Sequence, residues 1–517
     1  MKPFFKSLFY KTLNLQQLIV AAVSGIIMGL SPEPLNWWVL SWIALFPLWL
    51  LVSKAQVRKA AILSFVWGFC FHATALFWIT GVHPMTWMGV PWLASLAIAI
   101  AVWLVIGCWG GLFVLCWGLG LAFCSHRLKI TGFTRLLFAV ALWCCLESIW
   151  SYSPLWWSSL SLTQSPHNLV ILQLAQLSGF NTVTAAIVAV NGAIAEGITE
   201  YIPSSDRYRK LAVPLILFVA FHGVGWLLYQ VPVAADNLDP IRVGIIQGNI
   251  PNEIKLYSQG WAKAIDGYTT GYQSLAPKVD VVLTPETALP FYWEDIIDNG
   301  TFYKAVKENK VPAWVGAYGS ENKSYTNSLF TLTAEGATYS RYDKTILVPL
   351  GEYIPFEPII GKIIDRLSPL EAHLQRGQWG QIFDTPFGRA VVGICYESAY
   401  ARHFRRQTAA GGEFMLTASN NAHYSDTMPA QHHAQDVIRA IESDRWMARA
   451  TNTGYSAIVD PRGRSIWRSQ INQYQTYADR IYKRHTITPF VRWGDWLTVA
   501  LLIICGGLLS ARTLKIF

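Results

Sequence analysis

A cysteine, a glutamate and a lysine each lie at or near the end of a predicted strand in the C-terminal half of the chain. Cys395 directly follows the apolar run Val391–Ile394. Glu286 comes three residues after Leu283, where a second apolar run ends, and Lys344 follows a third such stretch. A thiol, a carboxylate that removes its proton and a cation that stabilises an oxyanion are the groups that acyl transfer through a thioester requires. A base is needed because a thiol with a pKa of about 8.5 is only a few per cent thiolate at neutral pH.

Cys395 differs from the other cysteines in its surroundings. It alone lies in a polar part of the chain, so it has no disulfide partner there and is either a buried structural residue or a reactive one. Glu286 and Lys344 also have ordinary interpretations, as a surface carboxylate and a solvated ammonium. Taken together, the three favour a reactive thiol. The other seven cysteines lie in or beside long apolar runs, at Cys70, Cys108, Cys116, Cys124, Cys144, Cys145 and Cys505.

The composition indicates a membrane protein. Hydrophobic residues make up 52% of the 517 residues and charged residues 14%, against roughly 25% charged in soluble proteins. The 24 tryptophans suit membrane–water interfaces. The net charge of +9 could indicate a nucleic-acid partner, but the basic residues form no stripe that would follow a phosphate backbone, so we expect none.

Apolar runs long enough to cross a membrane predict an α-helical bundle of about eight spans. The loops between them alternate between basic loops and loops without Lys or Arg, which places the N-terminus in the cytoplasm and residues 231–490 on the opposite side. The predicted domains are a seven-span part over 1–230, a polar domain over 231–490 and a last helix within 491–517. The predicted spans are Leu15–Leu30, Trp37–Val52, Ala60–Gly81, Trp92–Phe123, Leu136–Trp150, Asn181–Glu196, Leu211–Tyr229 and Trp496–Ser510.

Two features of the membrane part leave alternatives open. Glu147 is the one acidic residue well inside a predicted span, and it is either a satisfied structural group or a functional carboxylate. The loop Ser151–Phe180, which contains Trp156 and Trp157, is either an interfacial platform or an ordinary aromatic belt.

In the polar domain, short β-branched runs alternate with helical stretches, which predicts an α/β sheet covered by helices. In such folds the side chains at the ends of strands form the site. Helical spacing is found in Trp261–Leu275 and Gln431–Arg449. The predicted strands are Ile241–Ile246, Val279–Leu283, Ala313–Gly316, Ser328–Leu332, Ala390–Ile394, Phe414–Thr417 and Ser456–Val459.

Three ordered motifs resemble those of a known superfamily. T-P-E at 284–286, Y-D-K at 342–344 and G-I-C-Y-E at 393–397 resemble the Glu-Lys-Cys motifs of the nitrilase, or carbon–nitrogen hydrolase, superfamily. With membrane spans on both sides, and with L-V-P-L-G-E-Y-I-P and S-N-N-A inside, the whole chain is similar to the apolipoprotein N-acyltransferase family. The resemblance implies a nitrilase-like αββα sandwich on the extracytoplasmic side of the bacterial cytoplasmic (inner) membrane.

The resemblance also implies a role for each motif residue. Glu286 would be the general base, Lys344 the oxyanion stabiliser and Cys395 the nucleophile. The acyl donor would be a membrane phospholipid, and the acceptor the N-terminal amine of the S-diacylglyceryl cysteine of an apolipoprotein. No cofactor is implied, and a monomer is expected although the oligomeric state stays open.

The supporting residues follow from the same resemblance. Glu352 matches a second family glutamate that helps to hold the lysine and the base. Tyr396 and Glu397 match the pair that follows the cysteine. The chain departs from the family where relatives usually have Trp-Phe after S-N-D-A, because it has His423-Tyr424 there. This departure leaves the details of the acyl or peptide pocket open.

Two further stretches have competing interpretations. His423, His432 and His433 could indicate a metal site, but their neighbours offer no clear ligand set, so we expect no metal and a solvated helix after Gln431. The apolar segment Phe356–Ile364 is either a flap that dips into lipid or part of the core.

Two other function classes compete with acyl transfer. A membrane-tethered amidase or nitrilase that hydrolyses a small C–N substrate would use the same three residues, but eight spans exceed what tethering needs. A transporter or receptor would leave the Glu-Lys-Cys set unexplained.

Overall fold

The structure, a computed structural model, divides into two compact units. A helical unit comprises Met1–Thr80, Ala97–Val231 and Trp493–Phe517, and an α/β unit comprises Gly81–Leu96 and Pro232–Arg492. The residues that the structure describes are 13–199, 207–233, 240–321, 324–349, 351–353, 374–422 and 425–513. His423-Tyr424 and Phe356–Ile364 therefore lie outside the described residues.

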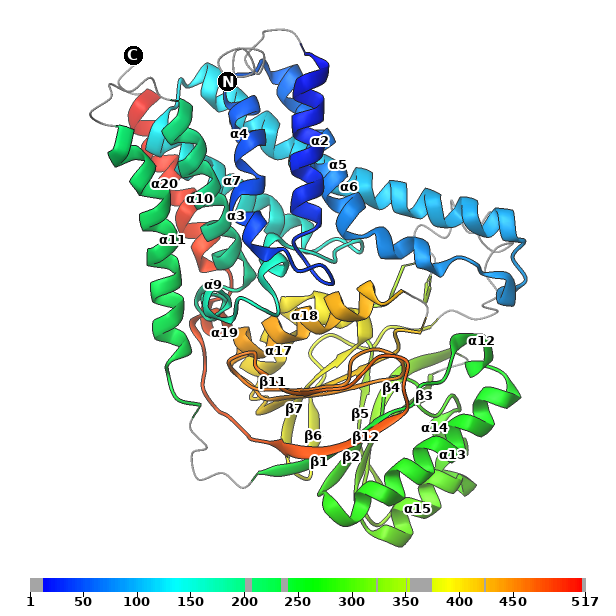
Figure 1. The fold of residues 1–517 in the computed structure, drawn as a ribbon. Coiled ribbons are helices and arrows are strands. Elements are labelled where there is room, and N and C mark those ends of the chain that lie inside the picture. The colour runs from blue at the N-terminus through cyan, green and yellow to red at the C-terminus, as the bar shows by residue number, and fades with distance from the viewer. Residues whose placement is uncertain are drawn as a thin grey trace. The chain divides into compact units, whose positions relative to one another are not determined.

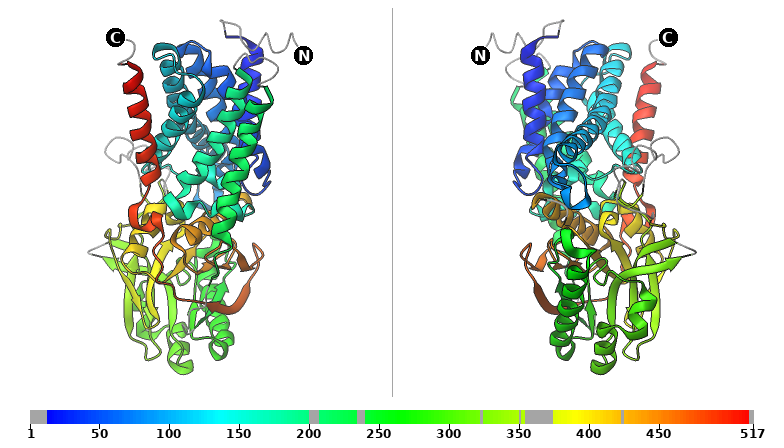
Figure 2. Two further views of the ribbon diagram at one scale, coloured as in Figure 1. Left: turned by 90° about the vertical axis from the view of Figure 1, so that its left-hand side faces the viewer. Right: turned by 90° about the vertical axis from the view of Figure 1, so that its right-hand side faces the viewer.

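Most of the long helices of the helical unit run alongside one another (Figure 2). Among the residues that the structure describes, four helical stretches are long and apolar enough to cross a membrane: Trp92–Arg127, Gly132–Trp150, Phe180–Ile198 and Ala212–Tyr229. Those helices are labelled in Figure 1 as α6 (Trp92–Arg127), α7 (Gly132–Trp150), α10 (Phe180–Thr199) and α11 (Arg207–Tyr229). The others in this unit are α2 (Leu15–Gly29), α3 (Ser41–Ala44), α4 (Phe46–Ser53), α5 (Val57–Ala75), α8 (Leu169–Leu172), α9 (Ala175–Ser178) and α20 (Trp496–Thr513).

The prediction of about eight spans is not confirmed in number. The first, second and eighth predicted spans form shorter apolar helices, over Leu15–Gly29, Trp38–Ser53 and Trp496–Ala511. The third predicted span corresponds mostly to α5, which is not among the four span-length apolar helices. The bundle of several apolar helices is confirmed, whereas the number that cross the membrane stays a prediction.

The second predicted span is interrupted between α3 and α4, and the side chain of Asn191 of α10 forms hydrogen bonds with backbone groups at this break. Its Oδ1 accepts hydrogen bonds from the backbone N–H groups of Leu45 (2.9 Å) and Phe46 (3.0 Å). Its Nδ2 donates to the carbonyl of Ser41 at 2.9 Å. Because unpaired backbone groups are costly in an apolar environment, Asn191 makes this break possible.

Glu147 of α7 is a satisfied buried group. Its side chain accepts a hydrogen bond from the Thr184 hydroxyl at 2.6 Å and another from the backbone N–H of Leu160 at 2.9 Å. These contacts support the structural alternative for this carboxylate, since it joins α7, α10 and the intervening loop.

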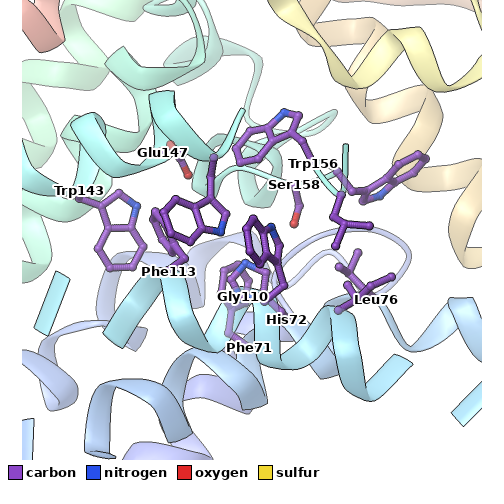
Figure 3. A pocket seen from close by; sticks show the side chains of 14 residues that line it. Phe71, His72, Leu76, Gly110, Phe113, Trp143, Glu147, Trp156 and Ser158 are labelled. Atoms are coloured by element: carbon purple, nitrogen blue, oxygen red, sulfur yellow. The ribbon is translucent and has the colours of Figure 1, made fainter. Parts of the chain in front are cut away.

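A pocket within the helical unit is lined largely by aromatic side chains (Figure 3). Glu147, His72 and Ser158 are polar members of its wall. Trp156 and Trp157 line it too and are buried, so they do not form the exposed aromatic belt that the sequence allowed. None of the six predicted site residues lies in this wall.

The α/β unit contains two six-stranded mixed sheets (Figure 1). The first has the strand order β12-β1-β2-β3-β4-β5 and the second β11-β10-β9-β8-β7-β6. In each, the three central neighbours are parallel: β1, β2 and β3 in the first, and β7, β8 and β9 in the second. The strands are β1 (Ile241–Gln247), β2 (Val281–Leu283), β3 (Ala313–Glu321), β4 (Ser324–Leu332), β5 (Thr338–Asp343), β6 (Phe383–Thr385), β7 (Gly388–Ile394), β8 (Phe414–Ser419), β9 (Met447–Thr451), β10 (Ala457–Val459), β11 (Ser465–Arg468) and β12 (Gln475–Ile481).

Helices cover the outer faces of both sheets, which gives four layers. One core lies between the sheets and includes Trp314 of the first and Phe414 of the second. A second core lies between the first sheet and α13 (Ser258–Leu275), α14 (Trp293–Asn299) and α15 (Thr301–Asn309). On the second sheet lie α17 (Ala401–Ala409) and α18 (Thr427–Ser443). The predicted nitrilase-like α/β architecture is confirmed at this level.

The prediction of one solvated helix over Gln431–Arg449 is wrong. Helix α18 ends at Ser443, because Asp444 adopts a left-handed φ of 52°, and Arg449 lies in strand β9. The polar face of α18 is buried rather than solvated, since Asp436 forms an ion pair with Arg449 and accepts from the Thr417 hydroxyl of β8 at 3.1 Å. These pairs attach the helix to two strands of the second sheet.

A buried ion pair in the helical unit gives the first prediction. Arg135 of α7 makes two hydrogen bonds of 2.6 Å to Glu196 of α10, which also accepts from Trp49 Nε1 at 2.9 Å. Glu196→Gln would leave the guanidinium buried without its anion, so we expect a loss of about 3–5 kcal/mol in the free energy of unfolding. Thermal unfolding in detergent micelles measures this.

The exposed Arg58 of α5 provides the control. We expect Arg58→Gln to unfold at the same temperature as the unchanged protein. An equally stable Glu196→Gln variant would contradict the assignment of this pair as a structural link.

Candidate active site

Three strand ends supply the predicted catalytic residues. Glu286 follows β2 and Lys344 directly follows β5, both in the first sheet, whereas Cys395 directly follows β7 of the second. The core between the sheets holds these strands together, so residues 109 positions apart in the sequence, Glu286 and Cys395, can meet at one place.

Lys344 lies between two carboxylates. Its Nζ is 2.9 Å from Oε1 of Glu286 and 2.8 Å from Oε1 of Glu352. All three side chains are largely buried, with 1% of the Lys344 side chain exposed. This geometry is consistent with the predicted role of Glu352, because Glu352 holds the ammonium of Lys344 against Glu286.

The backbone of Asn420 connects the glutamate to the cysteine. Its N–H donates to Oε2 of Glu286 at 2.8 Å, and its carbonyl oxygen lies 3.9 Å from Sγ of Cys395. The backbone of this one residue, at the end of β8, thus contacts both the carboxylate of Glu286 and the thiol of Cys395. Asn327 of β4 completes the carboxylate's environment by donating from Nδ2 to Oε1 of Glu286 at 2.6 Å.

Cys395 occupies a strained turn. Its φ is 51°, in the left-handed region that non-glycine residues seldom adopt, and it begins the 3₁₀ turn Cys395–Ala399. Such a conformation persists only where neighbouring contacts impose it, and it is common at functional sites. The turn places the sulfur at the end of β7 with 8% of the residue exposed.

Burial and charge set the protonation states of the site. Burial would raise the pKa of Glu286, but Lys344 outweighs it and holds that pKa below its ordinary value. Burial would lower the pKa of Lys344, but Glu286 and Glu352 hold it well above its usual range. Burial, reinforced by Glu286, raises the pKa of the Cys395 thiol. The resting site therefore holds a carboxylate, an ammonium and a neutral thiol.

Glu397 ties the cysteine turn to the lysine loop. Its carboxylate accepts from the backbone N–H of Ile394 at 2.8 Å, of Thr345 at 2.7 Å and of Ile346 at 3.1 Å. It also accepts from the Tyr342 hydroxyl at 3.0 Å. Glu397 is completely buried, so it acts as a structural link between the two sheets rather than as a group that meets substrate.

Tyr396, the other predicted supporting residue, packs near the turn. Its ring lies 5.3 Å from that of Tyr400 in an edge-to-face arrangement, and the residue is 8% exposed. It is near Cys395 in the chain and in space.

Several residues of the site escaped prediction from the sequence. Asn327 lies in no recognisable motif, and the S-N-N-A stretch that contains Asn420 assigns no role to that residue. His432 was considered only as a metal ligand. In the structure its Nε2 lies 2.9 Å from the carbonyl oxygen of Cys395, and Nδ1 accepts from Asn421 Nδ2 at 3.0 Å. It therefore holds the backbone of Cys395, the predicted nucleophile.

Comparisons with known proteins agree with the two units. Residues 242–477 match the carbon–nitrogen hydrolase family, and residues 24–193 match the apolipoprotein N-acyltransferase N-terminal domain. An apolipoprotein N-acyltransferase from Nostoc sp. is 54% identical over 91% of this chain and 94% of its own length. One from Synechocystis sp. is 46% identical over 92% of this chain and 97% of its own. The chain belongs to the apolipoprotein N-acyltransferase family.

A solved structure of an amidase from Nesterenkonia sp. is 13% identical, covers 50% of this chain and 96% of its own, and has a TM-score of 0.36.

The contacts of Glu397 give a prediction about this acyltransferase. Glu397→Gln would turn an NH₂ group towards buried backbone N–H donors, so we expect a loss of about 3 kcal/mol in stability. The transition measured by thermal unfolding should move to lower temperature. The exposed Glu335→Gln is the matched control and should change nothing. Equal melting temperatures for both variants would show that Glu397 does not link the two loops.

Proposed function

We propose that this chain transfers a fatty acyl group from a membrane phospholipid to the N-terminal amine of the S-diacylglyceryl cysteine of an apolipoprotein. Cys395 is the nucleophile, Glu286 the general base and Lys344 the oxyanion stabiliser. Family membership supports the activity. One observation above all supports the residue roles: the backbone of Asn420 bonds to Glu286 on one side and approaches the sulfur of Cys395 on the other.

The first half-reaction loads the cysteine. Glu286 takes the proton of the Cys395 thiol as the sulfur attacks the ester carbonyl of the phospholipid. The C–O bond to the glycerol breaks, and the proton passes from Glu286 to the leaving oxygen. A lysophospholipid departs, and an acyl thioester remains on Cys395.

The second half-reaction unloads it. The acceptor amine attacks the thioester carbonyl and gives a proton to Glu286. The C–S bond breaks, the sulfur regains a proton from Glu286, and the product is an amide. Glu286 thus begins and ends each half-reaction as a carboxylate, which its lowered pKa favours.

Lys344 is suited to stabilise the oxyanion because its partners change during the reaction. In the resting site it is bonded to both Glu286 and Glu352. When Glu286 takes a proton it becomes neutral, and negative charge develops on the carbonyl oxygen of the substrate. Lys344 then exchanges one anionic partner for another, so the charge separation within the buried site stays small.

Deprotonation of the thiol is uphill in the resting site, since the pKa of Cys395 is raised and that of Glu286 is lowered. The proton therefore moves as the C–S bond forms, when the oxyanion draws stabilisation from Lys344. A backbone N–H beside the cysteine would supply the second donor. The thiol is thus activated mainly when an ester is in place.

The membrane topology extends this proposal. We assign eight spans, with the shorter apolar helices such as Leu15–Gly29 and Trp496–Ala511 completing the four long ones. The domains are residues 1–230, 231–490 and 491–517, and the middle one faces the extracytoplasmic side of the cytoplasmic membrane. The alternation of basic loops with loops that lack Lys and Arg supports this orientation. Two lipid-anchored substrates would then meet the site at the membrane surface.

The covalent intermediate is directly testable. On incubation with phospholipid alone, we expect the intact mass of the enzyme to rise by one acyl chain, carried by the peptide that contains Cys395. Cys395→Ala should abolish the adduct. Glu286→Gln should slow its formation by about 10²–10⁴-fold, because the general base is lost.

Cys108→Ser, at an exposed cysteine of the helical unit, is the matched control and should acquire the adduct normally. An adduct on any peptide other than that of Cys395 would refute the role of this residue.

Acceptor dependence separates acyl transfer from hydrolysis. Without acceptor, we expect lysophospholipid release to stop after about one equivalent per enzyme, since the thioester has no amine to attack it. A lipopeptide with an S-diacylglyceryl cysteine and a free N-terminus should restore turnover, whereas the same lipopeptide with an acetylated N-terminus should not. Continuous release of free fatty acid without acceptor would favour the hydrolase instead.

A further inference from the structure

Lys255 is a buried cation beside the active site that the sequence did not single out. It is the last residue of α12 (Asn252–Lys255) and is 4% exposed. Its Nζ donates to the backbone carbonyl of Glu286 at 3.2 Å. A lysine ammonium has three N–H donors, and the ammonium of Lys255 has no other hydrogen bond or ion pair within the part of the chain that the structure describes. Burying an ammonium without a bonded carboxylate is costly, so its position calls for a physical reason.

The backbone of α12 is fixed in place on two sides. Asn252 accepts a hydrogen bond from Asn420 Nδ2 at 3.1 Å, which joins α12 to the residue that bridges Glu286 and Cys395. Gly260 of α13 packs so closely that a Cβ there would lie 2.7 Å from Cα of Lys255. These contacts determine the direction in which the Lys255 side chain leaves the helix.

The groups that act on Lys255 are those of the catalytic site. Burial lowers the pKa of Lys255 to about 8, while Glu286 from the loop after β2 and Cys395 from the turn after β7 both act to raise it. The attraction is mutual. Burial would raise the pKa of Glu286, and Lys344 and then Lys255 hold it down.

A second cation would favour the ionised state of both carboxylates of the site. Burial, together with Glu286, raises the pKa of Glu352 although Lys344 opposes this rise. When both carboxylates are ionised, Lys344, which is bonded to both, compensates only one of the two negative charges. The remaining negative charge would repel a thiolate at Cys395. Lys255 is a second buried ammonium, besides Lys344, that interacts electrostatically with both Glu286 and Cys395.

We infer that Lys255 is a positioning residue of the acyl-transfer site, whose positive charge keeps Glu286 ionised and stabilises negative charge on the sulfur of Cys395. It acts through these two residues and needs no contact with substrate. This inference rests on the proposed function of the site. Its test measures the reactivity of the Cys395 thiol and does not require acyl transfer.

The test is the rate at which iodoacetamide alkylates Cys395 at pH 7 in the full-length enzyme in detergent micelles, followed by peptide mass spectrometry. Lys255→Met keeps the length of the side chain and removes its charge. Because a rise of one unit in the pKa of the thiol lowers the thiolate fraction tenfold, we expect alkylation to be at least about tenfold slower. Lys255→Arg, which keeps the charge, should react at nearly the original rate.

The exposed Lys263→Met on α13 is the matched control and should react like the unchanged enzyme. Partial unfolding would expose Cys395 and speed its alkylation, so slower alkylation cannot come from a misfolded variant. Lys255→Met reacting at the original rate or faster would overturn the inference, as would Lys255→Arg reacting as slowly as Lys255→Met.

The two proposals fail separately in this design, since alkylation requires neither phospholipid nor lipoprotein. If Lys255→Met slows alkylation but the enzyme forms no thioester, the effect of the Lys255 charge on Cys395 is supported and acyl transfer is refuted. If the enzyme forms the thioester but Lys255→Met leaves alkylation unchanged, acyl transfer is supported and the role of Lys255 is refuted.

Discussion

The burial of Lys344 between Glu286 and Glu352 is the interaction on which the active site depends. An ammonium removed from water is stable only if anions replace its hydration, and here two carboxylates do so at 2.9 and 2.8 Å. The need for this pairing brings together the loop after β2 and the loop that begins at Lys344. It also leaves the carboxylate of Glu286 ionised, which is the state that a general base must have.

Cys395, the proposed nucleophile, is placed by a separate set of contacts on the second sheet. Cys395 has a φ of 51°, and the strain of this turn is compensated by Glu397 and His432, which bond to the backbone on either side of the sulfur. Glu397 reaches Thr345 as well, so the cysteine turn is fastened to the residue next to Lys344. The two sheets therefore present one site because a buried carboxylate joins their loops, in addition to the apolar core between them.

The residues that the sequence revealed are those whose signal is local. Glu286, Lys344 and Cys395 each follow a short strand and lie within a recognisable motif, so their meeting could be predicted from the order of strands and motifs. Asn327 and Lys255 carry no such signal, because what distinguishes them is their position opposite Glu286 in space.

The error at α18 has the same origin. Its charged residues have the pattern of a solvated face, since the pairing of Asp436 with Arg449 of β9 and Thr417 of β8 cannot be seen in one segment.

The burial of Cys395 suits a transferase better than a hydrolase. Burial raises the pKa of the thiol, which makes thiolate scarce until an ester carbonyl is in place. The same exclusion of water would protect the proposed thioester, because a residue only 8% exposed offers water little access to its sulfur. A hydrolase must admit water to complete its cycle, whereas a transferase must hold its acyl group until an amine arrives. A slow, shielded thiol that depends on neighbouring charges for its reactivity suits the second task.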